Sequence, residues 1–93
     1  MVLLREELGE VLKECRTKQK MTLRDVSTRS SVALGYISEI ERGHKEASSE
    51  ILLAITQALN LPLSQVLADA ADRIALFETP VPDTIPDDFY QDR

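Results

Sequence analysis

Residues 22–43 of the chain read TLRDVSTRSSVALGYISEIERG, and the periodicity of this stretch predicts two short helices joined by a tight turn. Thr22 is a favourable N-cap residue, and Asp25 stands three positions later, where its side chain can complete a capping box. The small and apolar residues of the first helix share one narrow face: Leu23, Val26 and Ser27. Residues 28–31 are polar, and we predict that they form the turn.

The second helix is predicted over residues 33–42 and is buried on one side. Its apolar residues recur at helical spacing: Val32, Tyr36, Ile37 and Ile40. Gly43 ends the helix, because glycine readily adopts the left-handed conformation that terminates helices. Ala33 stands where a Ser or Thr would usually cap the helix, and Ser31 is an alternative cap that would start it earlier. Two helices this short cannot bury their apolar faces alone, so they require a scaffold from the rest of the chain.

The composition indicates one small helical domain. The 93 residues are 43% apolar but include only two tyrosines, two phenylalanines and no tryptophan, which favours a core of Leu, Ile, Val and Ala. No apolar run reaches the roughly 18 residues of a membrane span, and the first residues lack the pattern of a secretory signal. The single cysteine cannot form an intrachain disulfide, so we expect a cytoplasmic protein with no membrane partner.

The charge is distributed unevenly along the chain. The formal net charge is −5, which by itself disfavours a partner with negative phosphates. Residues 13–45, however, contain eight Lys and Arg residues against four acids, whereas residues 46–93 contain two against nine. The molecule therefore has a basic end and an acidic end, and phosphate binding depends on the local charge.

A first amphipathic helix is predicted over residues 4–19. Its apolar stripe consists of Leu4, Leu8, Val11, Leu12 and Cys15. Gly9 lies inside this helix at a cost of about 1 kcal/mol relative to alanine, which close packing of a neighbouring helix would explain. Cys15 has no partner at metal-ligand spacing, so we interpret it as a packing residue rather than a reactive thiol.

Two more helices follow the central stretch. Ser48 or Ser49 caps the fourth helix and Asn60 ends it. The apolar face of the fourth helix consists of Ile51, Leu52, Ile55, Ala58 and Leu59. The fifth helix, over residues 63–78, carries a heptad seam that exceeds what one small core can cover. We therefore predict a homodimer with this interface: Leu63, Leu67, Ala70, Ala71, Ile74 and Phe77. The alternative is that this half folds back onto its own domain.

Residues 79–93 are predicted to form an extended acidic arm. This segment contains three of the four prolines of the chain and four of its acids. Proline excludes a regular helix over most of it. The arm could dock on the dimer partner or become ordered with another protein, and its acids would keep it away from DNA.

The central stretch resembles the helix-turn-helix core of the Cro/C1-type (XRE-like, lambda-repressor-like) DNA-binding family. The matching residues are LRDV at 23–26, Val32 and YISEIERG at 36–43, and the resemblance covers about residues 5–67. It implies an all-α, five-helix DNA-binding domain over residues 1–67, here with an extended fifth helix and a C-terminal arm for dimerisation. The longer run ALGYISEIERGHKEASSE resembles the actinobacterial regulators of the Clp protease genes. That resemblance implies an activator of Clp protease and stress-response genes, with RNA polymerase and a Clp protease as further partners.

The resemblance also implies which residues meet DNA. Lys20 and Arg24 stand beside the N-terminus of the first motif helix, where the free N–H groups of Thr22 and Leu23 can bind a phosphate. The alternative is a solvated basic turn. The second motif helix becomes the recognition helix in the major groove. Its outward side chains, with Tyr36 partly buried at the edge, are Ala33, Leu34, Gly35, Tyr36, Ser38, Glu39 and Arg42.

Base reading by this helix should be sparse. The family positions that match Leu34, Gly35 and Glu39 usually meet base edges, but Leu34 can only touch thymine methyl groups and Gly35 reads nothing. Glu39 can accept a hydrogen bond from a cytosine amino group, and the shape of the DNA would carry much of the specificity. His44 and Lys45 follow the helix and are placed to meet phosphates. A lone histidine makes no metal site, and nothing else in the sequence supports a pH switch.

Glu41 faces inward by helical phase, and a buried carboxylate requires a partner. Family geometry points to Arg16 on the first helix, so the resemblance implies an ion pair that fastens this helix to the recognition helix. The alternative is an exposed glutamate.

The sequence as a whole predicts a sequence-specific transcriptional regulator that binds double-stranded DNA as a homodimer. Its operator should be a near-palindrome with half-sites about 34 Å apart or a multiple of that distance. The rival interpretation is an antitoxin or adaptor of the same fold that works mainly through protein contacts. We expect no enzyme, cofactor or metal, because the sequence has no catalytic triad, metal-ligand spacing or phosphate-binding glycine loop.

Overall fold

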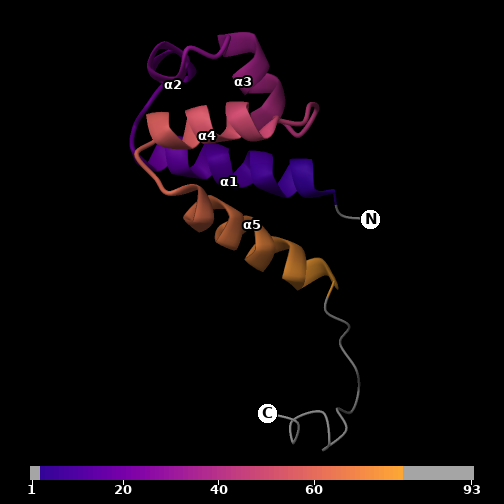
Figure 1. Cartoon of the computed structure of the whole chain (residues 1–93). Coiled ribbons are helices and arrows are strands. Elements are labelled where there is room, and N and C mark those ends of the chain that lie inside the picture. The colour runs from indigo at the N-terminus through magenta and orange to yellow at the C-terminus, as the bar shows by residue number, and fades with distance from the viewer. Residues whose placement is uncertain (1–2, 79–93) are drawn as a thin grey trace, which may run out of the picture.

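The computed structural model describes residues 3–78, which form an all-α domain (Figure 1). The five helices of this part of the chain are α1 (Leu4–Lys18), α2 (Leu23–Ser30), α3 (Leu34–Glu41), α4 (Ser49–Ala58) and α5 (Leu63–Glu78). The predicted all-α, five-helix fold is therefore confirmed. The arm predicted at residues 79–93 lies outside the described residues.

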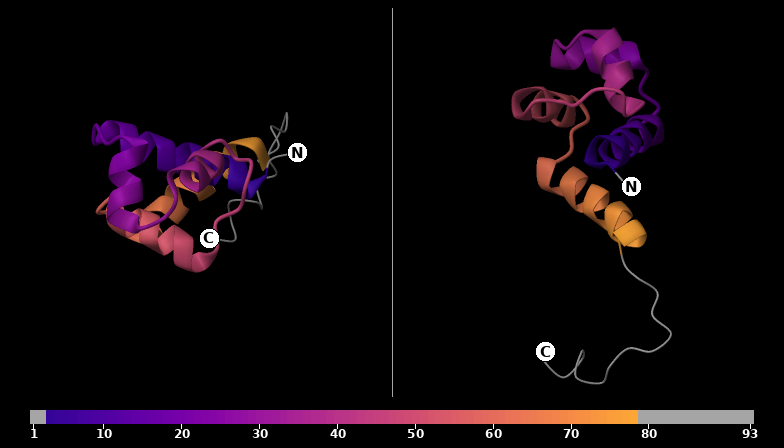
Figure 2. Two further views of the ribbon diagram at one scale, coloured as in Figure 1. Left: turned by 90° about the horizontal axis from the view of Figure 1, so that it is seen from above. Right: turned by 90° about the vertical axis from the view of Figure 1, so that its right-hand side faces the viewer.

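The helices are arranged in three tiers. Figures 1 and 2 show α2 and α3 at one end of the molecule, α1 and α4 in the middle, and α5 beyond them. α1 packs against α3 and α5, whereas α4 packs against α2 and α5. In the described part of the chain no single helix is long and apolar enough to cross a membrane, although α4 and α5, with 105° between them, pass that test as a bent pair.

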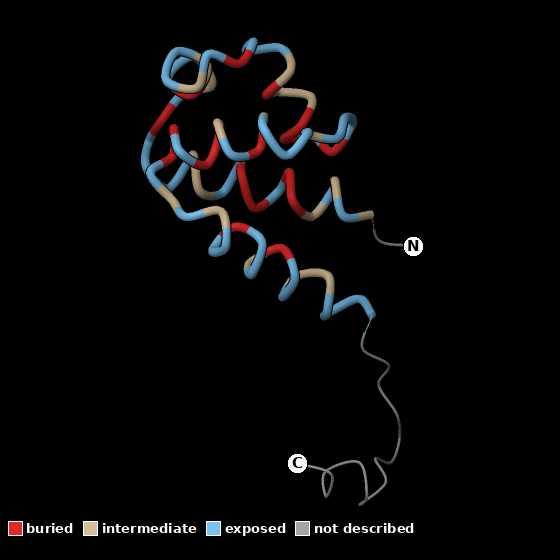
Figure 3. Tube along the Cα trace, viewed as in Figure 1, coloured by how far each residue is buried: buried red, intermediate tan, exposed pale blue. Residues whose placement is uncertain are grey.

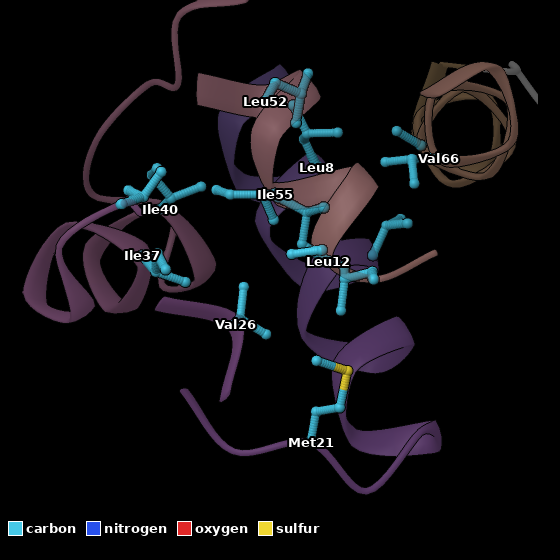
Figure 4. Packing of buried hydrophobic residues seen from close by; sticks show 14 residues of the cluster. Leu8, Leu12, Met21, Val26, Ile37, Ile40, Leu52, Ile55 and Val66 are labelled. Atoms are coloured by element: carbon cyan, nitrogen blue, oxygen red, sulfur yellow. The ribbon is translucent and has the colours of Figure 1, made fainter. Parts of the chain in front are cut away.

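The core is built from branched aliphatic side chains of all five helices (Figure 4). Figure 4 shows Val66 of α5 directed toward the side chains of α1 and α4. The largest fully buried side chains are Leu12, Ile37, Ile40, Ile55, Leu59, Val26, Val66 and Thr56. Leu4 was predicted to lie on the buried stripe of the first helix, but it is exposed because it stands at the very start of α1, beyond the helices that cover Leu8.

Helix α5 has its buried residues in its first half and is more exposed toward its end (Figure 3). Val66 and Ala70 are 0% and 1% exposed and belong to the core of one subunit. The prediction that Ala70 is left uncovered is therefore wrong, since α5 packs against α1 and its small residue is buried at this contact. Farther along the helix, Leu76 and Phe77 are 81% and 64% exposed.

Four helices end on residues in the left-handed conformation. Lys20, Ser31, Gly43 and Asn60 have φ angles of 58°, 61°, 77° and 59° and follow α1, α2, α3 and α4, respectively. At Gly43 the His44 N–H donates to Glu39 C=O and the Gly43 N–H donates to Ile40 C=O, which is a Schellman motif. The left-handed residue thus ends each helix without a side-chain cap.

The boundary between the two motif helices differs from the sequence prediction. Residues 28–30 were assigned to the turn, but α2 continues to Ser30 because its polar side chains form the exposed face of a helix. Ser31, with φ of 61°, ends α2, so it is not the alternative cap of α3. Ala33 occupies the N-cap position of α3 without a side-chain hydrogen bond.

Gly9 is the point of closest approach between α1 and α3. A Cβ atom there would overlap the carbonyl oxygen of Ile40 and lie 2.8 Å from the carbonyl oxygen of Glu41. The close packing expected at this glycine is therefore present, and no larger residue fits without moving the two helices apart.

We expect Gly9→Ala to lower the free energy of unfolding by about 1–3 kcal/mol through overpacking, although alanine is the better helix former. Urea denaturation followed by circular dichroism measures the change. Gly35→Ala is the matched control, because no heavy atom lies within 4 Å of a Cβ at that position. The control should gain up to about 1 kcal/mol, and an equal gain at Gly9 would contradict the close contact.

Candidate nucleic-acid interface

The N-terminus of α2 is held by a reciprocal capping box. The Asp25 N–H donates to Thr22 Oγ1 over 3.0 Å, and the Thr22 N–H donates to Asp25 Oδ2 over 2.8 Å. The backbone hydrogen bond from Thr22 holds the pKa of the Asp25 carboxyl below its ordinary value. The capping box leaves the N–H groups of Leu23 and Arg24 without a bond among the described residues. The side chains of Lys20 and Arg24 beside them are exposed, so the helix start has the free N–H groups and positive charges from which phosphate binding is predicted.

The turn between α2 and α3 is fastened by two serines. Ser27 Oγ donates to the Val32 carbonyl over 2.6 Å, and the Val32 N–H donates to Ser30 Oγ over 3.2 Å. Val32 itself is buried against the core. The hydrogen bond of Ser27 fixes how α3 leaves the turn, a role that its place on the apolar stripe did not reveal.

Helix α3 is buried on one face and open on the other. Ile37 and Ile40 are in the core, whereas Ala33, Leu34 and Gly35 are exposed. The half-buried Tyr36 donates its hydroxyl hydrogen to the Glu46 carbonyl over 2.9 Å. The open face therefore consists of the outward residues predicted from the helical phase, with Ser38 and Glu39 half-buried and Arg42 exposed.

The ion pair between Arg16 and Glu41 is present in the structure. Arg16 Nε and Nη2 donate to Glu41 Oε2 and Oε1 over 2.7 and 2.9 Å, and their side chains are 13% and 7% exposed. The hydrogen bond to Glu41 raises the pKa of Arg16 above its ordinary value. Arg16 Nη1 also donates to the Met21 carbonyl over 2.9 Å. One side chain thus connects α1, α3 and the loop that leads into α2.

The loop after α3 is pinned by a residue that the sequence analysis missed. Arg5 Nε donates to the Gly43 carbonyl over 3.0 Å, and Arg5 Nη1 lies 3.9 Å from Glu46 Oε1. Arg5 stands 38 residues away in sequence, so no local pattern could have indicated the contact. The anchored loop presents His44 and Lys45 on the surface.

The side chain of Glu39 is bonded within its own subunit. Its Oε2 lies 2.8 Å from His44 Nδ1, and its Oε1 lies 3.9 Å from Arg42 Nη2. Arg42 Nη2 also donates to Ser38 Oγ over 3.1 Å. The predicted hydrogen bond from a cytosine amino group to Glu39 would therefore have to share the carboxylate with His44.

The described residues contain no group of three or more His, Cys, Asp or Glu side chains that could hold a metal ion. Cys15 is half-buried, and burial is the main cause that raises the pKa of its thiol. A thiol with a raised pKa is a weak nucleophile at neutral pH. This agrees with the interpretation of Cys15 as a packing residue.

The family of the chain follows from comparison with known proteins. A helix-turn-helix family model matches residues 12–66, which include α2, α3 and the ion pair that joins them to α1. The chain belongs to the helix-turn-helix family. The Cro/C1-type resemblance that the signature at residues 36–43 predicts is confirmed by this match.

Two regulators are similar to the chain over most of its length. The transcriptional regulator ClgR of Mycobacterium tuberculosis is 59% identical over 73 residues, which are 78% of this chain and 65% of that protein. The match thus spans just under two thirds of the length of this curated relative. The crystal structure of the clp gene regulator ClgR from C. glutamicum is 45% identical, with a TM-score of 0.77 over 82% of this chain and 99% of that chain.

A more distant structure shares only the fold. The restriction-modification controller protein C.AhdI from Aeromonas hydrophila is 22% identical, with a TM-score of 0.65 over 67% of this chain and 94% of that chain. The two ClgR proteins are named as regulators rather than enzymes. The expectation that the chain is not an enzyme agrees with these relatives.

We expect Arg16→Met and Glu41→Met each to lower the free energy of unfolding by about 3–5 kcal/mol, because each leaves a buried charge unpaired. The double variant should lose less than the sum of the two single losses. Urea denaturation of the four proteins gives this double-mutant cycle. Arg42→Met, which removes an exposed pair, should change stability by less than about 1 kcal/mol. Additive losses at Arg16 and Glu41 would contradict their coupling.

Proposed function

We propose that the chain is a sequence-specific DNA-binding transcriptional regulator that acts as a homodimer. One observation carries the proposal: α3 is packed against the core through Ile37 and Ile40 while Leu34, Gly35 and Arg42 on its other face stay open. A helix exposed in this way fits the major groove of DNA. The identity to ClgR proteins further supports the proposal.

Phosphate contacts would flank the recognition helix on both sides. The predicted anion site at the start of α2 and the loop with Lys45 both have exposed cations, and hydrogen bonds hold the backbone of each. Such contacts provide affinity and fix the register of a protein on the duplex without reading its sequence. The negative net charge does not oppose binding, because these groups lie at the basic end of the chain.

Base reading would rest mainly on apolar contacts. Leu34 and Ala33 are exposed at the N-terminal end of α3 and fit thymine methyl groups. Gly35 has open space around it, which allows the helix backbone to lie close to the base edges. The scarcity of hydrogen-bond donors on this face makes DNA shape and deformability a large part of the specificity.

The exposed apolar residues of α5 would form the dimer interface. Leu67 and Phe77 are exposed apolar side chains on a single helix, and Ala71 between them allows close approach of a second helix. Ile74 is half-buried, and Leu63 packs partly against the core of its own subunit. Relative to the sequence prediction, Ala70 leaves the interface because it is buried in its own subunit. Leu76 is exposed too, but it lies about half a turn around the helix from Leu67 and therefore on the opposite side. A two-fold symmetric pairing would present two recognition helices to one duplex.

The names of the similar regulators point to a gene target. We propose that the chain activates Clp protease and stress-response genes, with RNA polymerase as the partner in activation and a Clp protease as the enzyme that removes the regulator. The identity of 59% and 45% to ClgR proteins supports this assignment. The antitoxin or adaptor alternative would be supported by a protein partner in the absence of DNA binding.

We expect selection of bound duplexes from a random DNA pool to return one near-palindrome with half-sites about 34 Å apart or a multiple of it. Leu34→Ala should relax the preference for a T·A pair at one position in each half-site. Lys45→Ala should weaken all sequences alike and lower the slope of log affinity against log salt by about 1 per subunit. Selection that returns no common sequence would contradict specific binding.

We expect Phe77→Asp to convert a dimer into a monomer at micromolar concentration, because a charge would be buried at the paired helices. Sedimentation equilibrium measures the mass directly. Leu53→Asp is the matched control, because Leu53 is likewise a large apolar residue exposed on the surface but lies on α4. A dimer that survives Phe77→Asp and is lost on Leu53→Asp would move the interface to α4.

A further inference from the structure

His44 and Glu39 are joined twice across the turn that ends α3. The His44 N–H donates to the Glu39 carbonyl over 2.9 Å as part of the Schellman motif. The side chains meet as well, with His44 Nδ1 2.8 Å from Glu39 Oε2. The histidine ring is exposed and stands on the loop that Arg5 anchors. Its position beside the open face of α3 is therefore set by the backbone and by a carboxylate.

The contact determines which hydrogen bonds the other ring nitrogen can make. An ionised carboxylate only accepts, so Nδ1 must carry the hydrogen that it donates to Glu39. In a neutral ring, Nε2 then has a lone pair and can only accept. A phosphate oxygen is also an acceptor, so neutral His44 cannot hydrogen-bond a phosphate. Only the imidazolium form can donate to Glu39 and to a phosphate at the same time.

We propose that DNA binding by this chain takes up one proton per subunit at His44, with Glu39 as the residue that positions the ring. The proposal rests on the proposed DNA-binding function and names a requirement of the same site. Glu39 then acts through His44 rather than as a reader of cytosine. DNA phosphate supplies the second negative partner that makes the charged ring the favoured form in the complex.

Charged groups of the chain itself lie near His44 whether or not DNA is bound. The ring borders a surface hollow of about 460 Å³, whose charged lining from α1, α3 and α5 consists of Glu6, Glu7, Glu10, Lys13, Glu41, Arg42 and Arg73. Glu41 is paired with Arg16, and Arg73 bonds Glu7 over 3.0 Å. Of the remaining groups, Glu6 and Glu10 favour a positive ring, while Lys13 and Arg42 oppose it. The partner that distinguishes the bound state from the free state is the phosphate.

The sign of the effect follows from proton linkage. The bound state holds more protons than the free state, so the affinity for DNA rises as the pH falls. The pH dependence of the affinity disappears at high pH, where His44 is neutral in both the free and the DNA-bound chain. It also disappears at low pH, where His44 is protonated in both. A single linked proton changes the affinity by at most about tenfold per pH unit.

The test uses the full chain and the duplex that selection returns, at constant ionic strength. We expect the dissociation constant to be about 3–10-fold lower per subunit near pH 6 than near pH 8. The salt slope should also be steeper near pH 6, by about 0.9 per subunit, because one more cation contacts a phosphate. A change in the salt slope would not arise if His44 only supported the fold.

Three variants separate the roles of the residues. His44→Gln should abolish the pH dependence, and Glu39→Gln, which keeps an acceptor for Nδ1 but removes the charge, should reduce it. Lys45→Gln is the matched control and should lower the affinity by the same factor at both pH values. Circular dichroism establishes that each variant is folded.

Results that contradict the proton-linked contact differ from results that contradict the proposed regulator function. If the wild-type chain binds the selected duplex but its pH dependence is absent, or is unchanged in His44→Gln, the proton-linked contact is overturned and the regulator function stands. If Glu39→Gln alters base preference and leaves the pH profile unchanged, Glu39 reads DNA and the positioning role is overturned. Binding to no duplex at any pH would overturn the regulator function itself.

Discussion

The contact between α1 and the C-terminal end of α3 is the constraint on which the rest of the structure depends. Gly9 allows the two backbones to approach closely at the carbonyl groups of Ile40 and Glu41. At this short distance Arg16 can reach Glu41 with two hydrogen bonds. A buried carboxylate is destabilising unless it is paired in this way. The close approach and the ion pair therefore require one another, and together they hold one face of α3 against the core.

The same helix end organises the surface that would meet DNA. The Schellman motif at Gly43 turns the chain sharply, and Arg5 holds the turn through the Gly43 carbonyl. Tyr36 holds the next part of the loop through the Glu46 carbonyl. The loop therefore has a defined position although it lacks regular secondary structure. His44 and Lys45 owe their placement beside the open face of α3 to these backbone contacts rather than to their own side chains.

Helix α5 serves two purposes along its length. Its first half completes the core through Val66 and Ala70, and Arg73 then bonds Glu7 and Glu14 of α1. Beyond this point the helix extends past the other helices and its apolar residues remain uncovered (Figure 3). The orientation of the proposed dimer would thus be set by the contacts of α5 with α1.

The sequence by itself determined the helices, the capping box of Thr22 and Asp25, and the end of α3 at Gly43. These features depend on residue period and on hydrogen bonds between near neighbours, which a linear pattern contains. Only the tertiary structure decided that Ala70 is buried, that Arg5 holds the loop, and that Glu39 bonds His44. Such contacts depend on how helices cross and on which backbones approach closely, and spacing along one chain does not specify those distances. The ion pair of Arg16 and Glu41 depended on both sequence and tertiary structure. Helical phase indicates that Glu41 faces inward, and the family resemblance indicates its partner. The close packing at Gly9 then brings the two side chains together.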